Sequence, residues 1–254
     1  LKDRDPQQMK TRVRGLWMLV NMLAFYFDDM KVAEDTALNL IKYRTHEGCT
    51  FMVVPFLQFI SLNAMEIFAR TRKRKFHKLG RRYLKELKKW VDNKSLNVHH
   101  RLSMLLARQA SLKPRHDRET VQAMYDQAIS EARRTGFTHD AALATELAGR
   151  YLARHHSDKE GARRYLVDAV ELYTQWGAHA KVDQMEEAYN DILLGEDSGG
   201  FCGSLYSGVR GKPRFPSELE TKHEKLDPWK KEMGVRRRST VISLPQGLQD
   251  TLAM

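Results

Sequence analysis

The chain contains few cysteines, and none of them forms a recognisable pair. Cys49 and Cys202 are the two cysteines among its 254 residues. Neither belongs to a CxxC pair or to a Cys/His set with zinc-ligand spacing. A disulfide-stabilised scaffold and a structural zinc site are therefore not predicted, because both need more cysteines at defined spacings. We expect a reducing, cytoplasmic environment for this chain.

Long uninterrupted hydrophobic runs are also missing. Residues 16–27 are apolar but too few to cross a bilayer, and residues 51–69 are interrupted by Gln58, Asn63 and Glu66. A membrane-spanning helix needs about 20 consecutive apolar residues with almost no charge. We predict no transmembrane segment and no signal peptide. Both apolar segments are expected to be helices buried in a packed protein.

Motifs of catalytic chemistry are absent from the sequence. The phosphate-binding loop, the dinucleotide-binding glycine pattern, the kinase signatures and HExxH do not occur. Histidines form two adjacent pairs, His99-His100 and His155-His156. Adjacent helical side chains point about 100° apart, so neither pair would chelate one ion, and we predict surface or capping histidines. No catalytic residue, cofactor or metal is predicted, and this chain is not expected to be an enzyme.

Helical periodicity is what the sequence does contain, from about Gln7 to Leu194, and strand-like alternation is nearly absent. The first predicted helix is apolar on almost all sides, so we expect it to be central. Short connections between the helices predict an all-α array of antiparallel helix pairs. The predicted helices cover residues 8–28, 31–44, 51–70, 73–92, 97–111, 118–135, 139–155, 158–175 and 178–193.

Capping residues set several of these boundaries. Gly136 and Gly177 follow helical segments, where glycine commonly ends a helix. Thr138 and Ser157 precede the next two segments, and we predict that each is an N-cap.

The later helix pairs repeat a pattern of small and large residues. Ala148 and Tyr151 fill the small and aromatic positions of a first helix. Small residues at such positions allow the two helices of a hairpin to approach closely, so that neighbouring pairs stack. The pattern predicts an α-solenoid of tetratricopeptide-like hairpins. On the second helices a spacing of 0, +4 and +7 recurs 41 positions later, at Val121, Tyr125 and Ala128 and then at Ala162, Leu166 and Ala169.

The composition changes after Leu194, where glycine and proline become frequent and periodicity is lost. We therefore divide the chain into a helical repeat domain, residues 1–194, and a flexible basic linker or tail, residues 195–254. Within the tail, three arginines precede Ser239 directly. This arrangement suits a basophilic kinase, so Ser239 is a candidate phosphorylation site.

Positive charge is in excess, because 43 Lys and Arg residues against 32 Asp and Glu residues give a net charge of +11. The excess is concentrated between Arg70 and Lys89, where Glu86 is the one acidic residue. Three interpretations are open: a solvated helix face, a docking site for an acidic partner domain, and a site for nucleic acid or lipid headgroups. The candidate docking residues for an acidic partner are Arg74, Lys78, Arg81 and Lys85.

Several sequence blocks occur in an order that resembles a known family. The blocks are LKKW at 87–90, NVHH at 97–100, YDQAI at 125–129, DAALATELAGRYLAR at 140–154, and WGAHAKV at 176–182 with MEE at 185–187. They resemble the tetratricopeptide-like helical region that follows the ATPase module in large multidomain signalling proteins. The resemblance covers residues 79–194, and the block that begins at Trp176-Gly177 is a fairly specific part of it.

Proteins of this family join a kinase-like domain, an AAA/STAND-type predicted ATPase, the helical region, and then a GAF, histidine-kinase or cyclase domain. The resemblance implies a non-catalytic regulatory fragment that couples an upstream nucleotide-binding module to an output domain and holds protein partners in a concave groove. A start at Leu1 rather than at Met agrees with a fragment. The rival hypothesis is a helical-repeat nucleic-acid-binding module that uses the basic helix at 70–89, although repeated base-reading positions are not visible.

Limited proteolysis tests the predicted boundary after Leu194. The periodic apolar faces end at this residue, and the following residues lack the apolar density that offsets the entropy lost on folding. We expect a protease to remove residues beyond about 195 and to leave a helical core. A core whose cooperative unfolding requires residues 195–254 would contradict the boundary.

Overall fold

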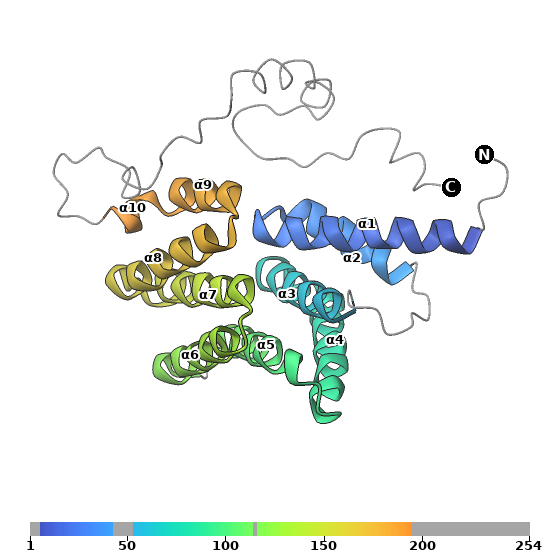
Figure 1. Cartoon of the computed structure of the whole chain (residues 1–254), viewed down its shortest axis with the longest axis horizontal. Helices are drawn as coiled ribbons and strands as arrows, with labels where there is room; N and C mark the ends of the chain where they lie inside the picture. Colours follow the sequence, from blue (N-terminus) through green and yellow to red (C-terminus); the bar gives the residue numbers. More distant parts are fainter. Residues whose placement is uncertain (1–5, 43–52, 114–115, 195–254) are drawn as a thin grey trace, which may run out of the picture. The chain divides into compact units, whose positions relative to one another are not determined.

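The computed structural model describes residues 6–42, 53–113 and 116–194, and these ranges contain helices and loops but no strand (Figure 1). The predicted all-α class is thus confirmed for this part of the chain. The chain divides into two units, residues 1–195 and 196–254, and every described residue belongs to the first unit.

The observed helices follow the predicted periodicity closely. The predicted segment 178–193 is divided in two at Tyr189, and the fifth long helix is preceded by a short 3-10 turn. The elements are α1 (Pro6–Tyr26), α2 (Met30–Lys42), α3 (Val53–Thr71), α4 (Arg74–Asp92), η1 (Leu96–Val98), α5 (His99–Ser111), α6 (Arg118–Arg134), α7 (Thr138–His156), α8 (Lys159–Trp176), α9 (His179–Ala188) and α10 (Asn190–Leu193).

Consecutive helices pack as pairs: α1 with α2, α3 with α4, α5 with α6, and α7 with α8. The first helix of each later pair also contacts both helices of the pair before it. Thus α3 packs on α1 and α2, α5 on α3 and α4, and α7 on α5 and α6, while α9 packs on α8. This scheme places α3 and α7 between neighbours on several sides (Figure 1).

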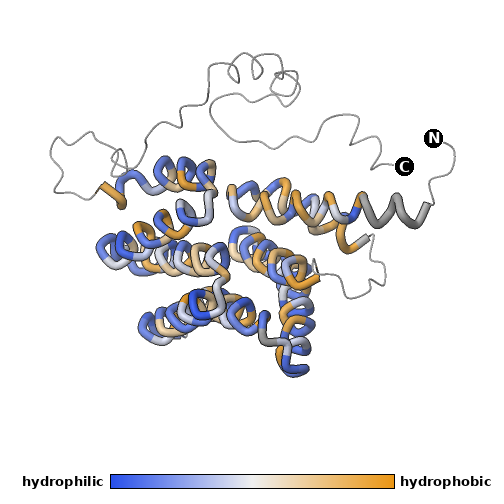
Figure 2. The backbone as a smooth tube through the Cα atoms, viewed as in Figure 1, coloured by the Kyte–Doolittle hydropathy of each residue, from blue (hydrophilic) through white to orange (hydrophobic). Residues whose placement is uncertain are grey.

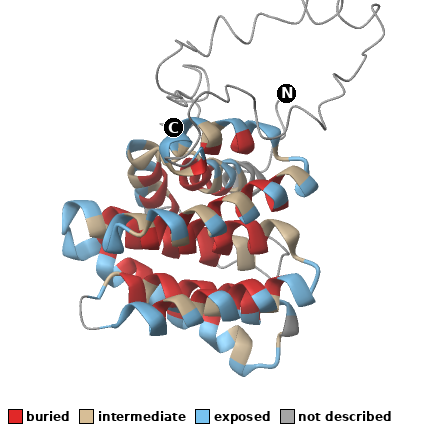
Figure 3. Ribbon diagram, turned by 90° about the vertical axis from the view of Figure 1, so that its left-hand side faces the viewer, coloured by how far each residue is buried: buried red, intermediate tan, exposed pale blue. Residues whose placement is uncertain are grey.

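Burial follows from this arrangement. Residues 56–67 of α3 and 140–152 of α7 are buried without a break, and Figure 3 shows such buried bands along the inner helices. The expectation that the first helix is central is wrong, because α1 contacts only α2 and α3 extensively and leaves Leu16, Leu19 and Leu23 exposed. Figure 2 shows hydrophobic residues along α1. Among the helices of the described ranges, none has the length and apolar character that a bilayer span requires.

Two of the predicted caps are correct and two are wrong. Gly136 and Gly177 follow α6 and α8 with φ of +77° and +81°, the left-handed conformation that favours glycine. Thr138 is itself the first residue of α7 and not its cap. Ser157 ends α7 in a left-handed conformation, and the N-cap of α8 is Asp158, whose carboxylate accepts a backbone N–H three residues ahead at 2.8 Å. Aspartate is as good an N-cap as serine, and α8 is capped one residue later than predicted.

Gly149 in α7 provides a test of the close packing of α7 against α8, and Gly15 in α1 provides the comparison. A Cβ added at Gly149 would lie 2.8 Å from Cγ of Leu166 and 3.2 Å from the carbonyl oxygen of Ala162, whereas a Cβ at Gly15 would meet no atom within 4 Å. We expect Gly149→Ala to destabilise the protein by about 1–3 kcal/mol, because α7 and α8 must separate. Gly15→Ala should stabilise it by about 0.4–1 kcal/mol through the lower entropy of the unfolded chain. Urea unfolding of both variants measures the difference, and a Gly149→Ala variant as stable as the parent would contradict the close packing.

Candidate functional site

Helix α4 carries the basic residues that the sequence singled out. Phe76, Leu79, Tyr83 and Leu87 are buried on one side of the helix, which packs against α3. At Gly80 the two helices come close, because a Cβ built there would lie 3.5 Å from side chains of α3. The charged residues consequently lie on the opposite side, which faces solvent, because burying them without partners would remove the water that stabilises their charge.

We define the basic face of α4 as its exposed Lys and Arg residues opposite the buried side. None of them forms an ion pair with another residue in the ranges that the structure describes. From Arg74 to Lys88 successive members are three or four positions apart, and Lys89 follows Lys88 directly, so they lie along one side of the helix. The residues of the basic face are Arg74, Lys78, Arg81, Lys85, Lys88 and Lys89.

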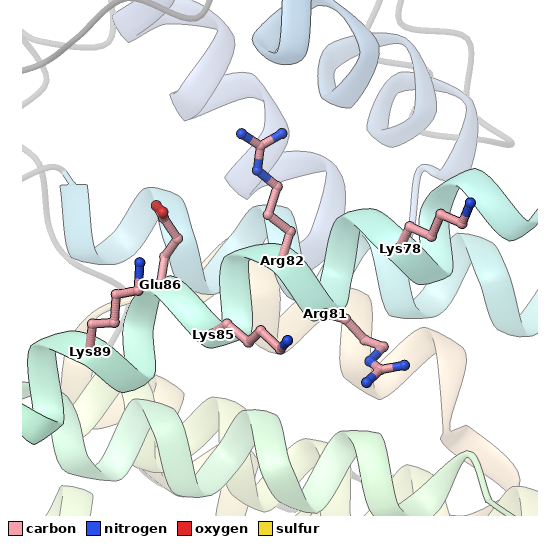
Figure 4. A pocket seen from close by; sticks show the side chains of 6 residues that line it. All are labelled: Lys78, Arg81, Arg82, Lys85, Glu86 and Lys89. Atoms are coloured by element: carbon pink, nitrogen blue, oxygen red, sulfur yellow. The ribbon is translucent and has the colours of Figure 1, made fainter.

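An open depression of about 530 Å³ lies along this helix. Figure 4 shows Arg82, Glu86 and Lys89 pointing to one side of it and Arg81 and Lys85 pointing to another. Glu86 is the one carboxylate in the lining, so the depression presents several ammonium and guanidinium donors to solvent. Such donors suit carboxylate or phosphate groups of a partner.

The basic segment found in the sequence is divided in two by the fold. At its N-terminal end the cations are paired: Lys73 Nζ donates to Glu34 Oε1 of α2 at 2.7 Å, and Lys75 Nζ lies 3.8 Å from the same oxygen. Arg70 Nη2 donates to Asp28 Oδ1 at 2.6 Å. The start of the segment therefore fastens α3 and α4 to the first helix pair, and the basic face begins after it.

Glu66 forms the first of three buried carboxylate clusters, and it is only 2% exposed. Arg108 Nη2 donates to Glu66 Oε2, while Arg70 and Arg154 donate to Oε1 at 3.1 and 3.2 Å. Arg150 Nη2 lies 3.5 Å from Oε1. Burial alone would raise the pKa of Glu66, but the guanidinium groups of Arg108 and Arg150 hold this pKa well below its usual value. Glu66 is therefore ionised, and it links α3 to α5 and α7.

The cations of this cluster outnumber its anions. Four guanidinium groups face Glu66 and Asp28, because Asp28 accepts from Arg70 and lies 3.6 Å from Arg150. Arg150 Nη1 also lies 4.0 Å from Glu146 Oε1. Arg70, Arg108 and Arg154 belong to the last turns of α3, α5 and α7. The negative ends of three helix dipoles, each equivalent to about half a charge, offset most of this excess. The cluster is therefore close to neutral as it stands.

Asp140 forms the second cluster, at the start of α7. Its Oδ2 accepts from His100 Nε2 at 2.9 Å and from Arg101 Nε at 2.8 Å, and its Oδ1 accepts from Gln58 Nε2 at 2.9 Å. The prediction of a surface or capping histidine is wrong for His100, which is buried and stacked on Phe137. Burial raises the pKa of Asp140, and the His100 hydrogen bond and the Arg101 charge lower it to about 2.

Glu146 forms the third cluster, which brings distant parts of the sequence together. Lys181 Nζ of α9 donates to Glu146 Oε1 at 2.8 Å and to the carbonyl oxygen of Tyr26, the last residue of α1, at 2.7 Å. Tyr173 donates its hydroxyl to Glu146 Oε2 at 2.9 Å. Tyr26 also lies against the rings of Tyr173 and Trp176. The end of α1 is thereby held to α7, α8 and α9.

Seven of the nine candidate repeat positions are buried at helix interfaces, and Trp176 and Gly177 are not. Trp176 is 48% exposed at the end of α8, and Gly177 follows it with positive φ. Ser239 lies outside the described residues. The buried members are Tyr125, Ala128, Ala148, Tyr151, Ala162, Leu166 and Ala169.

The buried clusters were not foreseen from the sequence, and their chemistry is structural. Each carboxylate is held by cations or hydroxyl donors from other helices, so its lone pairs are occupied. No group of three or more His, Cys, Asp or Glu side chains able to hold a metal ion occurs in the described ranges. The basic face of α4, in contrast, has no ion-pair partner within the described ranges.

No protein-family model, curated protein or solved structure matches the chain.

The acid dependence of stability tests the Asp140 cluster. The pKa of Asp140 is about 2 in the folded protein, below its usual value of 3.8. The ionised carboxylate therefore contributes stability that is present above pH 3.8 and is lost as the pH falls toward 2. We expect Asp140 to account for about 2 kcal/mol of the free energy of unfolding that is lost on acidification. The Asp140→Asn variant should lack this part of the loss. Urea unfolding followed by circular dichroism from pH 6 to pH 2 measures it.

The exposed Asp191 provides the matched control for this measurement. Asp191→Asn should retain the full acid-dependent loss of stability. If Asp140→Asn retained it too, the buried ionic pairing of Asp140 would be refuted.

Proposed function

We propose that this chain is a non-catalytic helical-repeat module that binds an acidic protein partner or neighbouring domain through the basic face of α4. The observation that carries the proposal is the exposure of six Lys and Arg residues in one stripe without ion-pair partners in the described ranges. Elsewhere in those ranges many cations are paired with carboxylates, as for Lys73, Arg70 and Arg118. An unpaired stripe of one sign favours a partner of the opposite sign.

The finer architecture that we propose is a tetratricopeptide-like α-solenoid. Two observations support it. The first helix of each later pair packs on both helices of the pair before it, which is how repeats stack. Small residues lie at the closest helix contacts, as Gly149 does beside Leu166 and Ala162.

The buried carboxylates of α3 and α7 support a partner site on α4 and not among the packed helices. Glu66, Asp140 and Glu146 are buried there and are already bound by cations of this chain. An acidic partner would have to displace these carboxylates from buried arginines or Lys181, which would leave buried charges unpaired. Binding of a partner at the basic face of α4 requires no such displacement.

The resemblance to multidomain signalling proteins supports a wider role. In that role the module couples an upstream nucleotide-binding domain to a downstream output domain in the cytoplasm, and it uses no cofactor. Ser239 follows three arginines and is the proposed phosphorylation site of the segment after the helices.

Nucleic-acid binding is the second candidate, favoured by the net charge of +11 and by the same stripe. The two candidates differ in salt dependence and in choice of ligand. Cations that bind duplex DNA displace condensed counterions, so log K falls by about 0.9 per phosphate contact for each unit of log salt. An acidic protein surface carries no comparable counterion layer, and its binding weakens less steeply with salt.

Charge reversal on α4 tests the proposed function. We expect Arg74→Glu, Lys78→Glu, Arg81→Glu and Lys85→Glu, introduced together, to weaken binding of a labelled poly-glutamate peptide about tenfold or more, because attraction becomes repulsion. Fluorescence anisotropy at several salt concentrations measures it, after circular dichroism has shown that the helices persist. Four exposed basic residues outside α4 that form no ion pair within the described ranges, each changed to Glu, serve as the matched control: Lys31, Lys94, Lys113 and Arg134.

Equal losses in the two quadruple variants would show that overall charge decides and would refute a specific docking face. Sub-micromolar, sequence-selective binding of DNA or RNA by the parent at physiological salt would instead establish the nucleic-acid candidate.

A further inference from the structure

Helix α1 has an apolar stripe on the side that faces away from the rest of the fold. Leu16 and Leu23 are 45% and 40% exposed, and Val13, Val20 and Phe27 are partly exposed. The opposite side of α1 packs within the fold through residues that are almost fully buried: Arg14, Trp17, Met18, Asn21, Ala24 and Phe25. The helix therefore has two apolar sides, and the fold covers one of them.

The spacing of the uncovered residues is that of a helix-to-helix seam. Val13, Leu16, Val20, Leu23 and Phe27 follow one another at intervals of three, four, three and four. In heptad terms valine occupies position a and leucine position d, the combination that favours two-stranded coiled-coil packing. A solvated helix face would carry polar residues at these positions, so the stripe fits a second helix laid along it.

The charge pattern indicates which molecule supplies that helix. Residues 15–27 contain no charged side chain, although the chain carries a net charge of +11. Two copies of a strongly basic chain repel each other over most of their surfaces, but they can meet along an uncharged face. A heptad stripe is also complementary to its own copy, which is the requirement of a two-fold interface.

We propose that two copies of this chain associate through the outward stripe of α1. The stripe from Val13 to Phe27 is about 21 Å long at 1.5 Å per residue. This contact is smaller than a standard interface, which buries about 800 Å² per partner. We therefore expect the dimer to be weak and reversible.

Sedimentation velocity of the full chain, from about 2 to about 200 μM, measures this association. We expect the weight-average mass to rise from monomer toward dimer. Leu16→Glu with Leu23→Glu, and separately Leu16→Lys with Leu23→Lys, should each shift the equilibrium at least about tenfold toward monomer, because like charges then face each other. An equimolar mixture of the two double variants should associate again, since opposite charges meet. Leu106→Glu, at an exposed leucine of α5, is the control and should dimerise like the parent.

The mixture separates a lost interface from a lost fold, because a misfolded variant cannot be rescued by another variant. A parent that stays monomeric at all concentrations would overturn the proposal. So would association that survives both double variants, or a mixture that fails to associate. A dimer that forms only after removal of residues 195–254 would show that this segment, and not a second copy, covers the stripe in the full chain.

Discussion

The arrangement of the inner helices depends on one buried carboxylate. Glu66 lies on α3, is shielded from water, and is surrounded by guanidinium groups from α3, α5 and α7. Removing a partner from a buried ion pair costs about 3–5 kcal/mol, a large part of the net stability of a domain, so separating any one of the helices that supply these partners is strongly unfavourable. The ion cluster thus makes the relative positions of these helices specific, while apolar burial supplies most of the free energy of folding.

The sequence predicted the helices well because their cause is local. Apolar residues at intervals of three and four, together with Gly136 and Gly177, define most boundaries to within two residues. The central position of the first helix was predicted wrongly for a related reason. Periodicity reports how many sides of a helix are apolar, but it does not report whether a neighbour covers each side.

The buried charge clusters could not be predicted from the sequence, because the residues that pair in them lie far apart along the chain. Glu66 meets Arg108 at a separation of 42 residues and Arg154 at 88, and Gln58 meets Asp140 at 82. The polar residues that argued against a membrane span in α3 prove to be its connections to other helices: Gln58 to α7, Glu66 to α5 and α7, and Asn63 to the backbone of Asn21 in α1. Likewise, charge counting located the basic segment, but only the fold shows that its first cations are paired with Asp28 and Glu34.

The hydrogen bond from Lys181 to the carbonyl oxygen of Tyr26 spans 155 positions of sequence. During synthesis the ribosome adds about 5–20 residues per second, so this partner reaches Tyr26 roughly 8 to 30 seconds after Tyr26 itself is made. Until then Tyr26 lacks its contacts with α8 and α9, although α2 and α3, which are synthesised earlier, already pack on α1. The order of the helices along the chain therefore makes the end of the first helix to be synthesised one of the last parts to reach its final packing.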